Sequence, residues 1–132
     1  MYLQIQVWNI TRHVLLAENI EIADSFCGRL KGLLGKSSFP AGTGLLIKPC
    51  NSIHSLFMRF IFDAVFLDGN FKVVYQMAGI HPFRISPIVH DAQMVLELPA
   101  GTISKTGTKI GDQLFLGKGD GIDQTVNTNQ HT

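Results

Sequence analysis

The sequence predicts a mainly β, mixed α+β fold: a small single domain with a barrel-like or sandwich sheet and one or two short helices. Two observations favour this class. Short runs rich in β-branched and aromatic residues recur along the chain, bounded by Gly, Pro, Asp or Asn. Helical spacing of apolar residues is confined to one short stretch. With 132 residues, the chain is long enough to bury a core without metals or disulfides.

Local patterns predict the individual strands. Alternation of polar and apolar residues predicts a half-buried strand at residues 2–10. The sequence Asp68-Gly69-Asn70 suits the turn of a hairpin between strands at 64–67 and 71–76. Further short strands are expected at residues 14–16, 19–22, 44–48, 95–98 and 112–116.

Caps and breakers predict the helices and the irregular segment. Asp24 or Ser25 can cap a helix that continues to about Leu34, and a helical turn is expected after Gly101. Residues 81–92 contain two prolines, which remove backbone donors, so this segment is expected to be irregular.

Composition and charge exclude several classes of protein. A chain with 45% hydrophobic and 16% charged residues is a core-rich globule. Eleven basic residues stand against ten acidic ones with no basic stripe, so nucleic acid is not an expected partner. No window reaches about 18 consecutive apolar residues, so no membrane-spanning helix is expected.

The termini and cysteines favour a cytoplasmic protein. The N-terminal residues lack a basic n-region, so no signal peptide is expected. Cys27 and Cys50 are interpreted as reduced thiols, with a single Cys27–Cys50 bridge as the alternative. The polar, aperiodic end of the chain predicts one globular domain over residues 1–117 and a disordered tail over 118–132.

Five polar residues set in apolar sequence form the candidate site: His54, Ser55, Arg59, Asp63 and Glu97. Burying a polar group is costly unless it is paired, so each residue needs a partner or a purpose. In a helix Arg59 and Asp63 would pair directly, whereas in a strand they would share a face about 13 Å apart. Two interpretations stay open: a polar layer that supports loops, or a guanidinium offered to a carboxylate or phosphate.

Glu97 has a different expected environment. Strand alternation places it on the face opposite Leu96 and Leu98, where exposure to solvent is expected. If that face is covered instead, a Glu97–Arg59 pair becomes attractive. Glu97 and Asp63 could also form a general acid/base pair.

Cys50 and His54 have a C-x3-H spacing. Zinc needs about four ligands, and the sequence has no second compact pair, so neither a metal nor a cofactor is expected. A nucleophile at Cys50 with His54 as its base is defined by a geometry that spacing alone does not give. The expected role of Cys50 is that of a small buried hydrophobe.

An ordered series of sequence blocks covers residues 20–117 and is similar to a known family. The blocks are Ala23-Asp24-Ser25, Arg29-Leu30-Lys31-Gly32-Leu33-Leu34, Gly44-Leu45-Leu46-Ile47, Ile53-His54-Ser55-Leu56-Phe57-Met58-Arg59-Phe60, Asp63 through Asp68, Val95-Leu96-Glu97-Leu98-Pro99-Ala100-Gly101 and Gly111-Asp112. Together they resemble the bacterial and archaeal family catalogued as domain of unknown function 192. Ile61 stands where one subgroup usually has Pro, and Leu34 where many relatives have Met. The resemblance implies no agreed reaction, cofactor or catalytic residue.

Three hypotheses for function remain. The first is a non-catalytic ligand-binding or accessory module, in which the Ser52–Asp63 region, with the His81–Asp91 loop, lines a shallow pocket or a partner surface. The five candidate residues are then its ligand-binding residues or polar network. The second is a small hydrolase that uses His54, Arg59 and an acidic residue. The third is a protein-assembly component, so the partner is an unknown small molecule or protein.

Overall fold

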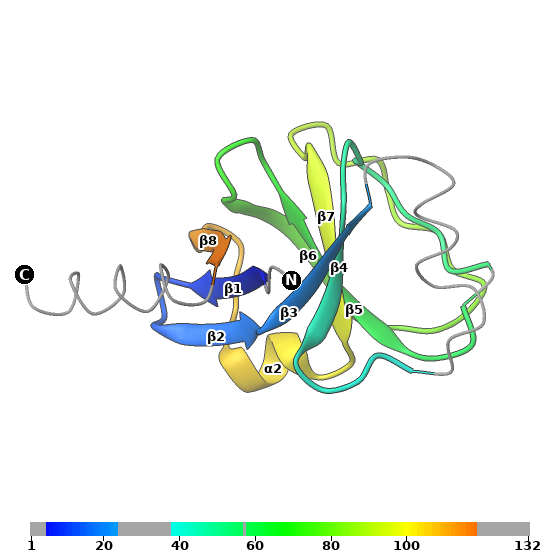
Figure 1. Ribbon diagram of the computed structural model, residues 1–132. Helices are drawn as coiled ribbons and strands as arrows, with labels where there is room; N and C mark the ends of the chain where they lie inside the picture. Colours follow the sequence, from blue (N-terminus) through cyan, green and yellow to red (C-terminus); the bar gives the residue numbers. More distant parts are fainter. Residues whose placement is uncertain (1–4, 24–37, 57, 119–132) are drawn as a thin grey trace, which may run out of the picture.

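The computed structural model describes residues 5–23, 38–56 and 58–118. These residues form two β-sheets and one short helix, which lies below the sheets in Figure 1. The small sheet has the strand order β2-β1-β8, and the large sheet has the order β3-β4-β7-β5-β6. The elements along the chain are β1 (Ile5–Asn9), β2 (Val14–Ala17), β3 (Asn19–Ala23), β4 (Thr43–Ile47), β5 (Phe62–Leu67), β6 (Val73–Ile80), β7 (Met94–Pro99), α2 (Thr102–Thr106) and β8 (Leu114–Lys118).

The strand pairing combines local and distant segments. β3 and β4 are parallel, whereas the other strand pairs of the two sheets are antiparallel. β5 and β6 form the predicted hairpin, in which Oδ1 of Asp68 accepts the N–H groups of Asn70 and Lys72 at 2.8 and 3.0 Å. β1 also pairs with β8, which comes from the other end of the described chain and completes the small sheet.

The first hydrophobic core lies between the two sheets. It includes Val7 from the small sheet, Val65 and Leu96 from the large sheet, and Ile103 from α2. These side chains are at most 7% exposed. Burial of apolar area on this scale is the main favourable term in folding.

A second core covers the opposite face of the large sheet. It joins Phe62, Phe66 and Val95 of the sheet to residues of the irregular segments 48–56 and 81–92, such as Ile53 and Ala92. The large sheet is therefore buried on both faces, and all six residues of β5 are buried.

The predicted mainly β, mixed α+β fold is confirmed, and the structure shows it as two sheets and one short helix among the described residues. Every strand predicted within the described residues is present, with ends that differ by a few residues, and the helical turn after Gly101 is α2. The predicted helix at 24–34 and residues 119–132 of the predicted tail lie outside the described residues. Lys118, which the tail prediction included, is the last residue of β8.

Candidate functional site

Ser55 joins two irregular segments of the chain. It is 1% exposed; its hydroxyl accepts the N–H of Arg84 at 2.8 Å and donates to the carbonyl of His81 at 2.7 Å. The backbone of Ser55 adds two bonds, from its N–H to the carbonyl of Arg84 and from the N–H of Phe83 to its carbonyl. Ser55 therefore connects residues 81–84 to the segment that precedes β5.

Asp63 is fully buried and bonds to the backbone of two elements. Its Oδ1 accepts the N–H of Gly79 at 2.9 Å, where β6 bulges, and its Oδ2 accepts the N–H of Ile103 at 2.9 Å in the first turn of α2. The residue at the start of that helix, Gly101, offers no side-chain cap. Asp63 supplies the acceptor from across the core, because buried N–H groups need one.

Arg59 does not form the pair that its spacing from Asp63 suggested. It is exposed in the irregular segment before β5 and makes no hydrogen bond or ion pair with any residue that the structure describes. His54 is also exposed, and it lies opposite Ile85 in an isolated bridge. The segment around Arg59 and His54 is neither a helix nor a regular strand, so neither predicted geometry applies.

Glu97 corrects the prediction that its face would be solvated. It is 2% exposed, because the second core covers that face of the sheet. Glu97 pairs with Ala64 and Leu45, which belong to the second core, whereas Asp63 pairs with Leu98 of the first core. Asp63 and Glu97 therefore face opposite sides of the sheet and cannot act together on one substrate.

Cys50 is buried in the second core, and its thiol donates to the carbonyl of Ser52 at 3.0 Å. Its predicted alternative partner, Cys27, lies outside the described residues. Across those residues, no group of three or more His, Cys, Asp or Glu side chains is arranged to hold a metal ion.

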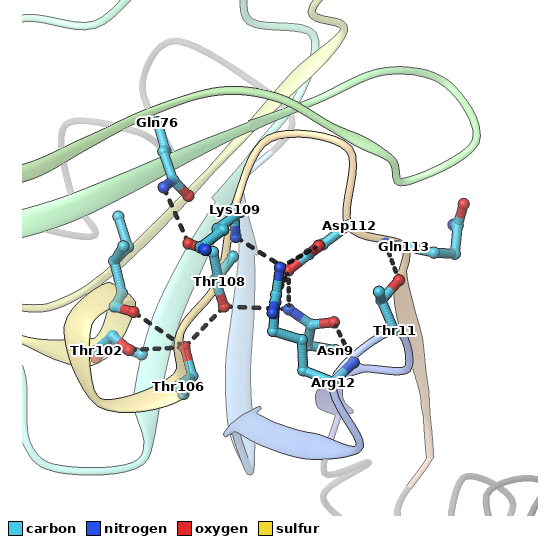
Figure 2. A network of polar contacts seen from close by, with 11 residues as sticks. Asn9, Thr11, Arg12, Gln76, Thr102, Thr106, Thr108, Lys109, Asp112 and Gln113 are labelled. Carbon is cyan, nitrogen blue, oxygen red and sulfur yellow. Dashed lines mark hydrogen bonds and ion pairs between the residues drawn. The ribbon is translucent and has the colours of Figure 1, made fainter.

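A second polar cluster, not singled out from the sequence, joins the two ends of the described chain (Figure 2). Asp112 is 4% exposed and accepts hydrogen bonds from Nε and Nη2 of Arg12 at 2.7 and 3.3 Å. Its Oδ2 also accepts the side-chain amide of Asn9 and the N–H of Lys109, each at 2.9 Å. Asn9 in turn donates to Thr108, and Figure 2 shows how these side chains converge on the turn before β8.

The environment of Asp112 sets its protonation. Burial alone raises the pKa of this carboxyl group, but the opposing hydrogen bonds from Arg12, Asn9 and Lys109, with the charge of Arg12, hold the pKa below its ordinary value of 3.8. The carboxylate is thus kept charged, and both of its oxygens accept hydrogen bonds. We call the side chains of Asn9, Arg12, Thr108 and Asp112 the polar network. We interpret its role as structural, because its hydrogen bonds connect β1 to the turn before β8.

Two cavities lie where the ends of β4 and β7 meet. The first has a volume of about 650 Å³, and the second, which extends between the two sheets, has about 340 Å³. Lys48 and Met94 line both, so the cavities adjoin. The lining of the first comprises Lys48, Pro49, Cys50, Asn51, Ala92, Gln93 and Met94, and that of the second comprises Ile5, Ile22, Leu46, Lys48, Phe71, Met94, Leu116, Gly117 and Lys118.

The lining of these cavities has a definite chemistry. The second is mainly aliphatic and aromatic, and the first adds the amides of Asn51 and Gln93. Lys48 and Lys118 contribute positive charge, and no acidic residue occurs among the described lining residues. Small-molecule sites typically have 300–1,000 Å³, apolar walls and a few polar groups. Both volumes fall in that range.

The backbone around the first cavity is held by hydrogen bonds. The N–H of Cys50 donates to the carbonyl of Gln93 at 3.0 Å, and the N–H of Gln93 donates to Leu67 at 2.8 Å. The N–H of Lys48 donates to Ala23 at 3.0 Å. The walls are thus fixed by the sheet.

Sequence reasoning missed the residues that line these cavities. Lys48 directly follows the apolar run of β4, and Gln93 directly precedes the apolar run of β7. A polar residue at the end of a buried strand is a recognisable signal, but it does not say which strand ends meet. Asp112 belonged to a sequence block that carried the family resemblance, yet its partners Asn9 and Arg12 are about 100 residues away.

The described helix is far too short to span a bilayer, and no helix among the described residues has the length and hydropathy to do so.

Comparisons with known proteins agree on one family. The family model described as "Uncharacterized ACR" (DUF192) matches residues 8–116. The UPF0127 protein of Pyrococcus furiosus is 29% identical over 111 residues, which are 80% of this chain and 93% of that protein. The UPF0127 protein of Pyrococcus horikoshii is 32% identical over 111 residues, with 80% and 94% of the two chains covered.

Two solved structures share the fold. A protein from Sinorhizobium meliloti 1021, described as a candidate transcription regulator, has a TM-score of 0.72 at 21% identity, with 85% of this chain and 91% of that chain covered. A protein of unknown function from Novosphingobium aromaticivorans has a TM-score of 0.72 at 19% identity, with 85% and 83% covered. Since the family model and the archaeal relatives cover most of the sequence, this chain belongs to the uncharacterised family DUF192.

Proposed function

We propose that the chain is a non-catalytic binding module for a small anion with an apolar tail. The single observation that carries the proposal is the pair of adjoining cavities that share Lys48 and Met94. A lysine that lines both a polar and an apolar cavity suits a carboxylate or phosphate attached to an alkyl or aryl group. The proposal also places the protein in the cytoplasm, where a buried thiol such as that of Cys50 stays reduced.

The hydrolase alternative is less well supported by the same contacts. It needs His54, Arg59 and a carboxylate at one reacting atom. Both oxygens of Asp63 accept backbone N–H groups, and Asp63 and Glu97 face opposite sides of the sheet. Among the five candidate residues, Ser55 and Asp63 support the scaffold, and ligand binding by His54, Arg59 and Glu97 stays a prediction.

Calorimetric titration with octanoate, next to the uncharged 1-octanol, tests the proposal. We expect saturable binding of octanoate and much weaker binding of 1-octanol. Lys48→Met keeps the length of the side chain and removes its charge, so affinity should fall about ten-fold, the effect of losing roughly 1.4 kcal/mol from a charge-assisted contact. Lys105→Met is the matched control, because Lys105 is an exposed lysine of α2 that lines neither cavity.

Two results would overturn the proposal. If alkyl carboxylates from hexanoate to dodecanoate all fail to bind, the cavities do not hold this class of ligand. If octanoate binds but Lys48→Met and Lys105→Met weaken it equally, the anion does not lie at Lys48.

A further inference from the structure

Four large apolar side chains lie on the surface of the segments that Ser55 joins. Phe83, Ile85 and Ile88 are 72%, 74% and 63% exposed, and Leu56 is 42% exposed. Single exposed apolar residues are common, but three such side chains within six residues of one segment are not explained by chance exposure. Such a group of exposed apolar side chains is typical of a surface that binds a partner.

The exposed side chains belong to two segments of backbone that pair with each other. His54 lies opposite Ile85, and residues directly opposite each other point to the same side. Burial alternates along residues 53–56, where Ile53 and Ser55 are buried and His54 and Leu56 are exposed, whereas in residues 83–88 only Ser86 is buried. His54 and Ile85 therefore point to the same side, and with the exposed neighbours Leu56, Phe83 and Ile88 they form what we call the loop surface.

Hydrogen bonds hold the loop surface rigidly in place. Besides the bonds of Ser55, the hydroxyl of Ser86 accepts the N–H of Ile53 at 2.8 Å and donates to the carbonyl of Pro87 at 2.9 Å. The N–H of Ser86 donates to the carbonyl of Ile53 at 2.9 Å, and that of Val89 donates to Asn51 at 2.8 Å. Such a segment presents its apolar side chains in a fixed arrangement instead of folding them inward.

The backbone of Phe83 has a strained conformation that burial of its ring does not offset. Its φ is +65°, a region that a bulky residue rarely adopts and that costs on the order of 1–3 kcal/mol. Phe71 has a similar φ of +64°, but its ring packs against the first core. The ring of Phe83 remains 72% exposed, so burial within this chain does not repay the strain.

The charges around the loop surface are mainly positive. The described residues of segments 51–61 and 81–93 include two basic residues, Arg59 and Arg84, both exposed, against the one acidic residue Asp91. The complete sequence is almost balanced, with eleven basic and ten acidic residues. The partner of the loop surface is therefore expected to be apolar and anionic together.

We infer that the loop surface docks on an anionic membrane surface, with Phe83, Ile85 and Ile88 inserted at the boundary between headgroups and acyl chains. A bilayer that contains acidic lipids provides both negative charge and an apolar layer, and short apolar segments flanked by basic residues bind it reversibly. None of these three side chains lines either cavity, as expected for side chains that insert and do not enclose a ligand. This inference goes beyond the proposed ligand site and does not depend on it.

Co-sedimentation with vesicles tests the inference on the full chain. We expect binding to phosphatidylcholine vesicles that contain phosphatidylglycerol, weaker binding at high salt, and little binding to phosphatidylcholine alone. Phe83→Ser and Ile85→Ser should each weaken binding about ten-fold or more, since each removes a large inserted side chain. Ile110→Ser is the matched control, because Ile110 is 59% exposed in the turn before β8 and not on the loop surface.

Several outcomes would overturn the inference. The wild-type protein could fail to bind acidic vesicles, or Ile110→Ser could lose as much binding as the loop-surface variants. A wild-type dimer that Phe83→Ser and Ile85→Ser dissociate in the absence of vesicles would make the loop surface an interface between two copies. Preference for duplex DNA over vesicles at the same ionic strength would also contradict it. Because the substituted side chains are exposed, thermal unfolding of the variants should match that of the wild type, and loss of vesicle binding is then assigned to the surface.

Discussion

Buried polar side chains serve two regions of this molecule, and the two regions present different surfaces. In the polar network of Asn9, Arg12, Thr108 and Asp112, side chains bond mainly to one another and close the gap between β1 and the turn before β8. In the irregular segments 48–56 and 81–93, Ser55 and Ser86 bond to backbone groups, and cavities and exposed apolar side chains lie beside them.

This difference distinguishes scaffold from candidate site. A network whose members satisfy each other has no capacity left for a ligand. A segment fixed by backbone bonds keeps its outward side chains available for a partner. We therefore expect substitutions in the closed region to change stability, and substitutions on the open side to change binding.

The largest effect on stability is expected for Asp63→Ala. It leaves the buried N–H group of Ile103 without an acceptor, at about 1–3 kcal/mol, and removes the partly buried bond from Gly79, worth about 1 kcal/mol, so the free energy of unfolding should fall by roughly 3 kcal/mol. Asp63→Asn retains one acceptor oxygen and should lose less. Urea denaturation measures both, and a wild-type midpoint for Asp63→Ala would show that Asp63 is not part of the scaffold.

The next effect is a dependence of stability on pH at Asp112. Its pKa is lowered in the folded protein, so the unfolded chain binds the proton more readily. The stabilisation is therefore fully present above the ordinary pKa of 3.8 and is lost as the pH falls below it through the folded value. Wild-type unfolding should show this loss as the pH is lowered below 3.8.

Asp112→Asn provides the comparison for that titration. It should be less stable than the wild type at pH 7, since an amide accepts fewer hydrogen bonds from Arg12, Asn9 and Lys109. Its stability should also change less between pH 5 and pH 2. If the free energy of unfolding depends on pH equally in the two proteins, the assigned role of Asp112 is contradicted.

A smaller effect is expected for Ser55→Ala. It removes the hydroxyl that bonds to Arg84 and His81, at a cost of about 1–2 kcal/mol, and should speed amide hydrogen exchange at Phe83 and Ser86. Ser52→Ala is the control, because the hydroxyl of Ser52 bonds to no described residue. Equal exchange in both variants would mean that Ser55 does not hold the loop surface.

The smallest effect on stability is expected for Lys48→Met. Lys48 is exposed, and its only hydrogen bond among the described residues comes from its backbone N–H, so unfolding should match that of the wild type within about 0.5 kcal/mol. Thermal and urea unfolding measure this directly. A clear destabilisation would place Lys48 in the scaffold and remove the contrast between the two regions.

The sequence predicted the fold well because strand signals are local. Alternation marked β1, Asp68-Gly69 marked the β5–β6 hairpin, and the run before Pro99 marked β7. The parallel pairing of β3 with β4 was not predicted, since it joins strands separated by 19 residues of intervening chain with no local signature. The cover on the second face of the large sheet was also missed, and that omission made the prediction of an exposed Glu97 wrong.

The candidate site was harder to predict than the fold. Polar residues within apolar sequence did identify Ser55 and Asp63 as buried, but spacing could not show that their partners are backbone groups of residues 81–84, 79 and 103. Lys48 and Gln93 meet only because β4 and β7 are neighbours in the sheet. A cavity formed by distant strand ends depends on topology, which one-dimensional patterns do not contain.

An NMR titration of the isotopically labelled chain with octanoate tests the central claim most directly, because it locates binding residue by residue. We predict saturable shifts of the amide resonances of Lys48, Asn51, Gln93 and Met94, with Leu116 responding at the apolar end. Resonances of Asn9 and Asp112 should stay unchanged. Shifts centred on the polar network, or no saturable shifts anywhere, would contradict the claim that the open side of this molecule holds its ligand.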